Sequence, residues 1–169
     1  MAAADRILKN FSLSLDGIGY VGKVDTAQIP ALTLATEEFR AGGMDAPIKL
    51  DMGQEAMEAE FTLSSFDNDA IALWGRADTS NLALTLRGAL EDADGTVTPL
   101  IVNISGPVQG LEAGEMQAGQ KGELSFTQNV RTLRWTQDGE VLIDLDIPNM
   151  VRIVNGVDQL AEKRAALGI

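Results

Sequence analysis

The feature that most constrains this chain is a period-two alternation of apolar and polar residues, interrupted by glycine-containing turns. In segment 82–90, leucine stands at every second position from Leu82 to Leu86. Alternate side chains of an extended strand point to opposite faces, so this pattern predicts a strand with one buried face. The dipeptide Asp138-Gly139 separates two further alternating segments, and Asp-Gly fits the tight turn of a β-hairpin. The chain is therefore predicted to be mainly β.

The same alternation predicts most of the remaining strands. They are expected at residues 11–16, 20–24, 32–39, 56–64, 100–104, 123–136 and 141–147, and a short extended piece is expected at 150–154. Segment 56–64 begins with good helix formers, but the alternation continues through Phe61 and Leu63, which favours a strand. The apolar parity changes near Arg131–Thr132, which predicts a β-bulge there. Seven or eight strands, mostly in hairpins, favour an antiparallel β-sandwich or barrel-like body.

Two short helices complete the expected fold. Asp67 is a good N-cap for a helix over 68–76, with Ile71, Leu73 and Trp74 on its buried face. Asp158 is expected to cap a C-terminal helix within 157–167, which Gly168 ends. The glycine- and proline-rich segment 40–54 and the Gly/Glu-rich segment 110–119 are expected to be loops. Since neither repeats nor composition shifts occur, residues 1–169 are expected to form a single domain.

Composition excludes several classes of function. The chain has 169 residues without cysteine or histidine, so disulfides, thiolate–metal sites and histidine-based catalysis are excluded. Its formal net charge of −12 opposes tight binding to nucleic acids. The N-terminus lacks the apolar core of a secretory signal, and no apolar run approaches the ~20 residues of a membrane span. We therefore expect folding in a cytoplasm.

Candidate chemical sites are weak. Carboxylates are paired at Glu37/Glu38, at Glu58/Glu60 and at Asp144/Asp146. A glycosidase needs two carboxyl groups across a sugar bond, whereas two acids on one strand face are usually a solvated surface. The two tryptophans, Trp74 and Trp135, fit core or interface anchors better than stacking platforms. We expect no catalytic residue, no metal and no cofactor.

Three ordered blocks carry a resemblance to a known family. They are IPAL (29–32) with EFRAGGMDAP (38–47), LDMGQEAMEAEF (50–61), and the C-terminal run from DGE (138–140) through NGVDQL (155–160) to LGI (167–169). In these blocks the chain resembles the major tail tube proteins of contractile-tailed phages and R-type pyocins. The resemblance implies an antiparallel tail-tube fold whose sheets join in a hexameric ring, with rings stacked into a hollow tube. It implies a structural subunit, not an enzyme.

The resemblance also implies partners and sites. The partners would be further copies of the chain, the tail sheath, baseplate and tail-terminator proteins, and the tape measure protein and transiting DNA inside the lumen. The product would be a virion tail or a pyocin particle, assembled in the bacterial cytoplasm. Segment 40–54 would be an extended loop reaching adjacent subunits or rings. The candidate contact residues are Arg40, Ala41, Gly42, Gly43, Met44, Asp45, Ala46, Pro47 and Met52.

Net acidity suggests which residues would line the bore, because phosphates slide past like charge without adhering. The candidates are Glu58, Glu60, Glu91 and Asp144. They could instead face the sheath or solvent. Three other functions stay open: a monomeric β-sandwich module that binds a ligand such as a carbohydrate, the inner-tube protein of a type VI secretion system, and a hydrolase built on the carboxylate pairs.

Overall fold

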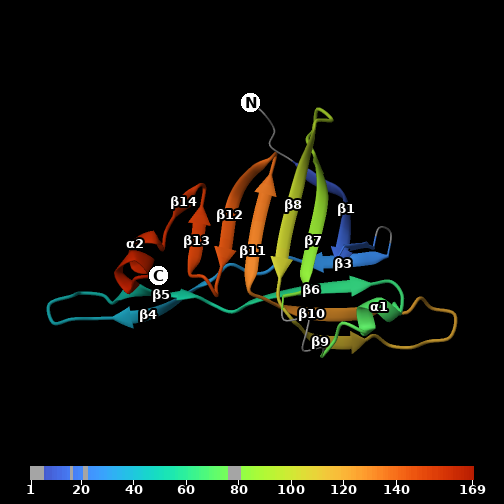
Figure 1. The fold of residues 1–169 in the computed structure, drawn as a ribbon, viewed down its shortest axis with the longest axis horizontal. Helices are drawn as coiled ribbons and strands as arrows, with labels where there is room; N and C mark the ends of the chain where they lie inside the picture. Colours follow the sequence, from blue (N-terminus) through green and yellow to red (C-terminus); the bar gives the residue numbers. More distant parts are fainter. Residues whose placement is uncertain (1–5, 16, 21–22, 76–80) are drawn as a thin grey trace.

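The computed structural model describes residues 6–15, 17–20, 23–75 and 81–169, which form three antiparallel sheets and two short helices. The largest sheet has eight strands, in the order β14 (Val157–Asp158), β13 (Val151–Val154), β12 (Glu140–Asp146), β11 (Thr132–Gln137), β8 (Val97–Ser105), β7 (Ala83–Glu91), β1 (Ile7–Leu15) and β2 (Ile18–Gly19). Figure 1 shows this sheet standing across a smaller one.

The smaller sheet has four strands, in the order β3 (Val24–Gln28), β6 (Met57–Leu63), β10 (Leu124–Val130) and β9 (Val108–Ala113). A separate two-stranded sheet consists of β4 (Leu34–Phe39) and β5 (Ile48–Gln54). The helices are α1 (Asn68–Ile71) and α2 (Ala161–Leu167). The β4–β5 hairpin extends past the four-stranded sheet on the side of α2 (Figure 1).

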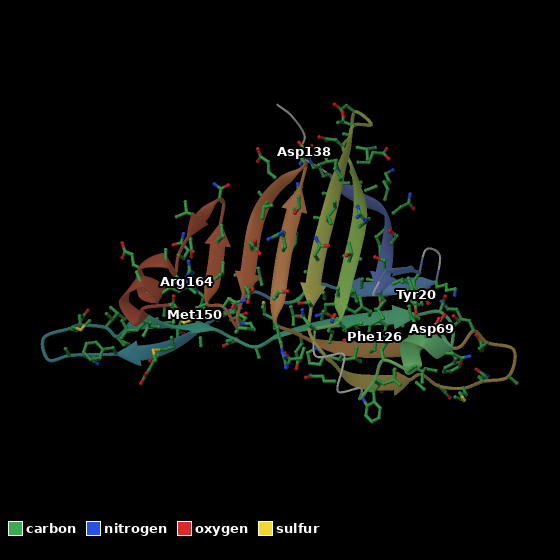
Figure 2. The ribbon with its side chains drawn as sticks, viewed as in Figure 1. Tyr20, Asp69, Phe126, Asp138, Met150 and Arg164 are labelled. Atoms are coloured by element: carbon green, nitrogen blue, oxygen red, sulfur yellow. The ribbon has the colours of Figure 1, made fainter. Side chains whose placement is uncertain are left out.

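The core lies between the eight-stranded and four-stranded sheets. Strand β6 alternates buried Met57, Ala59, Phe61 and Leu63 with outward residues, which confirms the strand predicted there. Phe61 and Phe126 meet in this layer with ring centroids 5.4 Å apart. Figure 2 labels Phe126 on the four-stranded sheet. Leu13, Leu84 and Leu133 are buried on the facing side. Each such side chain contributes about 1.5–3 kcal/mol of transfer free energy, so the interlayer core stabilises the fold.

The change of parity near residue 131 is not a bulge within one strand. Strand β10 belongs to the four-stranded sheet, and β11 belongs to the eight-stranded sheet. Arg131 lies between them, and its amide donates to the carbonyl of Ser105 at 2.7 Å. The buried positions change from Val130 on β10 to Leu133 on β11, so the parity changes where the chain leaves one sheet for the other. The predicted bulge was therefore wrong, although its position was right.

A buried polar contact holds this crossing in place. Gln128 is fully buried, and its side-chain amide donates to the carbonyls of Leu82 and Gly106 at 2.8 Å each. Gly106 has φ +154°, and a Cβ there would lie 1.8 Å from the carbonyl oxygen of Asn129. Only glycine allows the two backbones to approach this closely. The link between β8 and β9 is thereby fixed against β10.

The helices were predicted in the right places but with wrong details. The Asp67 carboxylate accepts from the amides of Asp69 and Ala70, as expected of an N-cap. However, α1 ends at Ile71, and Ile71 and Trp74 are exposed by 39% and 55%, so their predicted burial was wrong. Leu73 is half-buried against the core, and Ala70 is buried. A helix of four residues is too short to present a continuous buried face.

The C-terminal helix starts at Ala161, so Asp158 is not its N-cap. Asp158 instead ends β14, where its carboxylate accepts from the amide of Leu160 at 3.0 Å and pairs with Arg164. Arg164 also donates to the carbonyl of Met150 at 2.7 Å, which anchors α2 to the large sheet (Figure 2). Gly168 ends the helix with φ +74°, as predicted.

The strand count is higher than predicted. The described residues contain fourteen strands. Strands β5 and β9 lie in the expected loops, the strand predicted over 123–136 is divided into β10 and β11, and the short strands β2, β13 and β14 were not counted among the predicted strands. Val21 and Gly22, in the predicted strand 20–24, lie outside the described residues. The turn at Asp138-Gly139 is confirmed, with φ values of +53° and +78°. Within the described ranges, neither helix has the length and apolar character that crossing a bilayer requires.

Candidate assembly surfaces

The β4–β5 hairpin occupies most of the segment that was expected to lack regular structure. Strand β5 pairs with β4 from Leu34↔Gln54 to Phe39↔Ile48, so the expectation of a loop was wrong for residues 48–54. The tip, from Arg40 to Pro47, contains Gly43 at φ +92°. Arg40 Nε donates to the carbonyl of Met44 at 3.2 Å, and the Met44 amide donates to the carbonyl of Ala41. The tip is therefore an ordered turn.

One face of this hairpin is largely apolar and open. Phe39 lies opposite Ile48 on that face, and Leu50 continues it along β5 opposite Glu37. Met52 follows at the register shift of the hairpin, where it has no partner residue on β4. These four side chains are 43–59% exposed. An isolated two-stranded hairpin is at best marginally stable in water, and a contiguous exposed apolar surface usually marks an interaction site. The hairpin has the character of a surface that is completed by another chain.

An ion pair fixes the base of the hairpin to the large sheet. The Arg152 guanidinium on β13 lies 3.3 Å from the Asp51 carboxylate on β5. The Gly53 amide, together with Arg152, holds the pKa of Asp51 below its ordinary value. Beside this pair, an open groove of about 400 Å³ runs between the hairpin base and strands β12 and β13. Leu32, Leu34, Ile143 and Val154 line much of it, so it extends the apolar surface.

The outward face of the four-stranded sheet is polar and carries no positive charge. Its outward positions are Thr26 and Gln28 on β3, Glu58, Glu60 and Thr62 on β6, Ser125, Thr127 and Asn129 on β10, and Gln109, Gly110 and Glu112 on β9. None of these positions is a lysine or an arginine. Hydroxyls, amides and three carboxylates therefore form one continuous surface.

The face is ordered by hydrogen bonds that cross the strands. The Gln109 side chain donates to Glu58 Oε1 at 2.7 Å and accepts from Asn129 at 3.4 Å. Thr62 and Ser125 hydroxyls lie 2.9 Å apart. Strands β3 and β9 border the sheet, so one side of each has no partner strand within the described chain. This sheet thus presents a polar face and two open edges.

The family model "Phage tail tube protein FII" matches residues 5–168. The chain belongs to this tail tube family. The chain is 29% identical over 171 residues to the tail tube protein of Escherichia phage P2, a match covering 99% of both chains. It is 23% identical over 151 residues to the major tail tube protein of Serratia phage KSP20, covering 88% of this chain and 87% of that one. The predicted identity as a tail tube subunit is confirmed.

Solved structures share the fold. The chain superposes with a TM-score of 0.60 and 13% identity on a chain of an extracellular contractile injection system, from its PVC sheath–tube complex in the extended state. That match covers 79% of this chain and 93% of the other. A chain of the sheath/tube terminator of the same system gives a TM-score of 0.60 at 14% identity, covering 79% and 99%. The predicted β-rich tail-tube architecture is confirmed.

The predicted contact residues of this tail tube subunit lie together on the hairpin. Arg40, Ala41, Gly42, Gly43, Asp45, Ala46 and Pro47 are exposed at its tip, Met44 is half-buried, and Met52 is 59% exposed on β5. Phe39, Ile48 and Leu50, which form most of the apolar face beside Met52, were not among the predicted contact residues. The alternation of Ile48, Leu50 and Met52 was a usable signal that the nearby glycines and proline obscured. Met57 is buried in the core and belongs to the subunit's own packing.

The four candidate lumen residues fall on two sheets. Glu58 and Glu60 are exposed side by side on the outward face of the four-stranded sheet. Asp144 lies on β12 and accepts from Arg134 at 2.7 and 3.1 Å, whereas Glu91, at the end of β7, lies 3.7 Å from Lys9. The structure therefore brings the first two together and gives each of the others a cationic neighbour.

The carboxylate pairs have ordinary surface roles where the structure describes them. Glu37 and Glu38 are adjacent on β4 and so point to opposite faces of the hairpin. Asp146 accepts from the amide and side chain of Asn149, closing the turn after β12. Among the described residues, no group of three or more acidic side chains is placed to hold a metal ion. Trp135 is half-buried against the core, as an anchor should be.

Proposed function

We propose that six copies of this tail tube subunit close into a ring, and that rings stack into the hollow inner tube of a contractile tail. The observation that carries this proposal is the four-stranded sheet with its uniformly polar face and two open edges. Joining β9 of one copy to β3 of the next would satisfy the backbone donors and acceptors on both edges. The contact joins two different edges, so the interface is heterologous. Repeating it gives a closed ring when six equal rotations complete one full turn.

The polar face of that sheet would line the bore. Glu58 and Glu60, with Glu112 on β9, would present carboxylates without neighbouring lysine or arginine on the strand face. Such a surface repels phosphates and leaves DNA free to move through the tube. Glu91 and Asp144 lie on the other sheet, so we assign them away from the bore.

The hairpin would join copies along or around the tube. Its apolar face, formed by Phe39, Ile48, Leu50 and Met52, needs cover, and burying it on a neighbour supplies an association energy that offsets repulsion between acidic subunits. Surface charges beyond about 8–10 Å are largely screened at physiological salt, so short-range apolar contacts decide the balance.

The remaining partners follow from assembly in a tail. The tube would lie inside a sheath, start at a baseplate, end at a terminator, and hold a tape measure protein during assembly. Subunits would assemble in the bacterial cytoplasm and reside in a virion tail or a phage-tail-like bacteriocin. No step requires catalysis, so we assign the subunit a purely structural role.

A deletion tests the hairpin's part in this function. Removing Ala41–Ala46 shortens the tip without touching the core, so the variant should remain soluble, with the far-UV circular dichroism of the parent. It should form no tubes in negative-stain micrographs at concentrations where the parent does. Tubes of normal length and diameter from the deletion variant would contradict the proposed role of the hairpin.

A further inference from the structure

The direction of the backbone groups on β9 shows which residues face the open edge. The amide of Gly114 donates to the carbonyl of Glu123, and Gly110 lies opposite Thr127 in the pairing of β9 with β10. In an antiparallel pair, successive residues point their N–H and C=O groups alternately toward and away from the partner strand. Leu111 and Ala113 therefore direct their backbone groups away from β10, into the open edge. The pairing shifts register between Gly110 and Val108, but the Gln109 carbonyl shares a trans peptide with the Gly110 amide and so also points into the edge.

One of these edge groups is already occupied from within the subunit. The indole nitrogen of Trp74 donates to the backbone carbonyl of Gln109 at 3.2 Å. Trp74 lies in the segment after α1, 35 residues away in sequence, and is 55% exposed. Its ring therefore lies across the edge of the sheet and is not part of the core. Sequence alone placed this side chain inside, so its position outside calls for another explanation.

The position of Trp74 conflicts with the addition of a neighbouring strand. A paired strand lies about 4.7–4.9 Å away, in the space beside the carbonyls of the edge that it joins. An indole bonded to the Gln109 carbonyl occupies that space. Natural proteins commonly protect open edges by covering them, because an uncovered edge pairs with any available strand. Trp74 supplies such a cover at one point of β9.

We infer that Trp74 covers the β9 edge in the free subunit and blocks pairing there. It is displaced when β3 of a second copy pairs with β9. This inference rests on the proposed ring. The Trp74 cover slows pairing between free subunits. A growing tube end presents several contacts at once and therefore displaces the Trp74 side chain. Assembly is thereby directed toward existing tube ends.

The Trp74→Phe variant tests the hydrogen bond, and Trp74→Ala tests the whole cover. A net hydrogen bond corresponds to a factor of about 2 to 10 in an equilibrium constant, so Trp74→Phe should lower the critical concentration for tube formation by that factor. Trp74→Ala should lower it further and shorten the lag before light scattering rises. Trp135→Phe is the matched control, because it replaces the other tryptophan away from the edge and should leave both quantities unchanged.

The Trp135→Phe protein also has Trp74 as its single tryptophan, so its tryptophan fluorescence reports directly on the surroundings of Trp74. The emission should change in step with light scattering during assembly. If the wild type and both Trp74 variants form tubes with the same critical concentration and the same lag, Trp74 does not block the β9 edge. The proposed tube would still stand. An emission unchanged by assembly would also contradict the Trp74 cover. Failure of every protein to assemble would contradict the proposed ring itself.

Discussion

Arg152 on β13 holds Asp51 on β5 at 3.3 Å, and this ion pair joins the eight-stranded sheet to the two-stranded hairpin. The Arg152 side chain is only 16% exposed, whereas that of Asp51 is 41% exposed. A mostly buried guanidinium with a fixed position can set the angle of the hairpin that it contacts. The pair therefore links the rigid body of the subunit to the surface that we assign to neighbouring copies.

Replacing Arg152 with glutamine should weaken assembly more than it weakens the subunit. The Asp51 side of the pair is open to solvent, which weakens its contribution to folding, so the melting temperature should fall only modestly. The hairpin loses its fixed angle, so we expect fewer and shorter tubes in pelleting assays and micrographs. Arg87→Gln, at an exposed position of β7, removes the same charge and should assemble normally. Equal assembly by both variants would show that the pair does not position the hairpin.

The same pair gives a pH dependence with a defined sign. The pKa of Asp51 is lowered in the folded chain from an ordinary value of 3.8. The contribution of ionised Asp51 to folding stability is therefore complete at pH values above 3.8 and is lost as the pH falls below that value. Hairpin-dependent association should weaken in the same range, and Asp51→Asn should remove this component of the pH dependence.

Met52 and Val97 provide a matched pair of surface changes, because each side chain is 59% exposed. Met52→Asp puts a carboxylate on the apolar face of the hairpin and should abolish tube formation, since burying it there would leave a charge unpaired. Val97→Asp lies at the start of β8 and should assemble normally. Sedimentation of the two variants at equal concentration measures the difference. Tubes from Met52→Asp would mean that the hairpin face stays open to solvent.

Gly106 should tolerate no side chain. A Cβ there would lie 1.8 Å from the carbonyl oxygen of Asn129, so Gly106→Ala must displace the backbone where β8 and β9 meet. We expect an insoluble or unfolded protein. Gly95 has a similarly restricted φ of +85° but has no atom within 4 Å of its Cβ position, so Gly95→Ala should fold at a cost of about 1 kcal/mol. Urea unfolding compares the two, and equal stability would contradict the close approach.

Charge reversal at Glu58 and Glu60 tests the assignment of the bore. Tubes of the double variant Glu58→Lys, Glu60→Lys should retain short DNA duplexes that wild-type tubes do not, and retention should fall steeply as salt is raised. Glu140→Lys changes an exposed charge on the other sheet and serves as the control. Co-pelleting of labelled duplex measures retention. If the control tubes retain as much DNA as the double variant, the acidic face does not line the bore.

Sequence was most informative where local rules decide structure. Period-two patterns located β6, β7 and β12, and Asp138-Gly139 located a turn that requires positive φ at both residues. It was least informative where distant segments decide. The parity change at Arg131 depends on the passage of the chain from one sheet to the other, and the place of Trp74 depends on a backbone carbonyl 35 residues away. Neither relationship leaves a pattern in the neighbouring residues.

The candidate surfaces divide in the same way. The sequence predicted the candidate contact residues of the hairpin tip and the pair Glu58 and Glu60. Which of the candidates lie on one surface depends on how the sheets are arranged. Glu91 and Asp144 share the outward acidic pattern, yet topology places them on the other sheet beside Lys9 and Arg134. Strand β5 was missed because the glycines and proline before it outweighed three alternating apolar residues.

Cryo-electron microscopy of the purified wild-type protein tests the central claim most directly. The account predicts hollow tubes of stacked rings with sixfold symmetry, in which β9 of one copy pairs with β3 of the next and Glu58 faces the lumen. A protein that remains a uniform monomer at high concentration would contradict the account. So would a tube in which both edges of the four-stranded sheet stay unpaired.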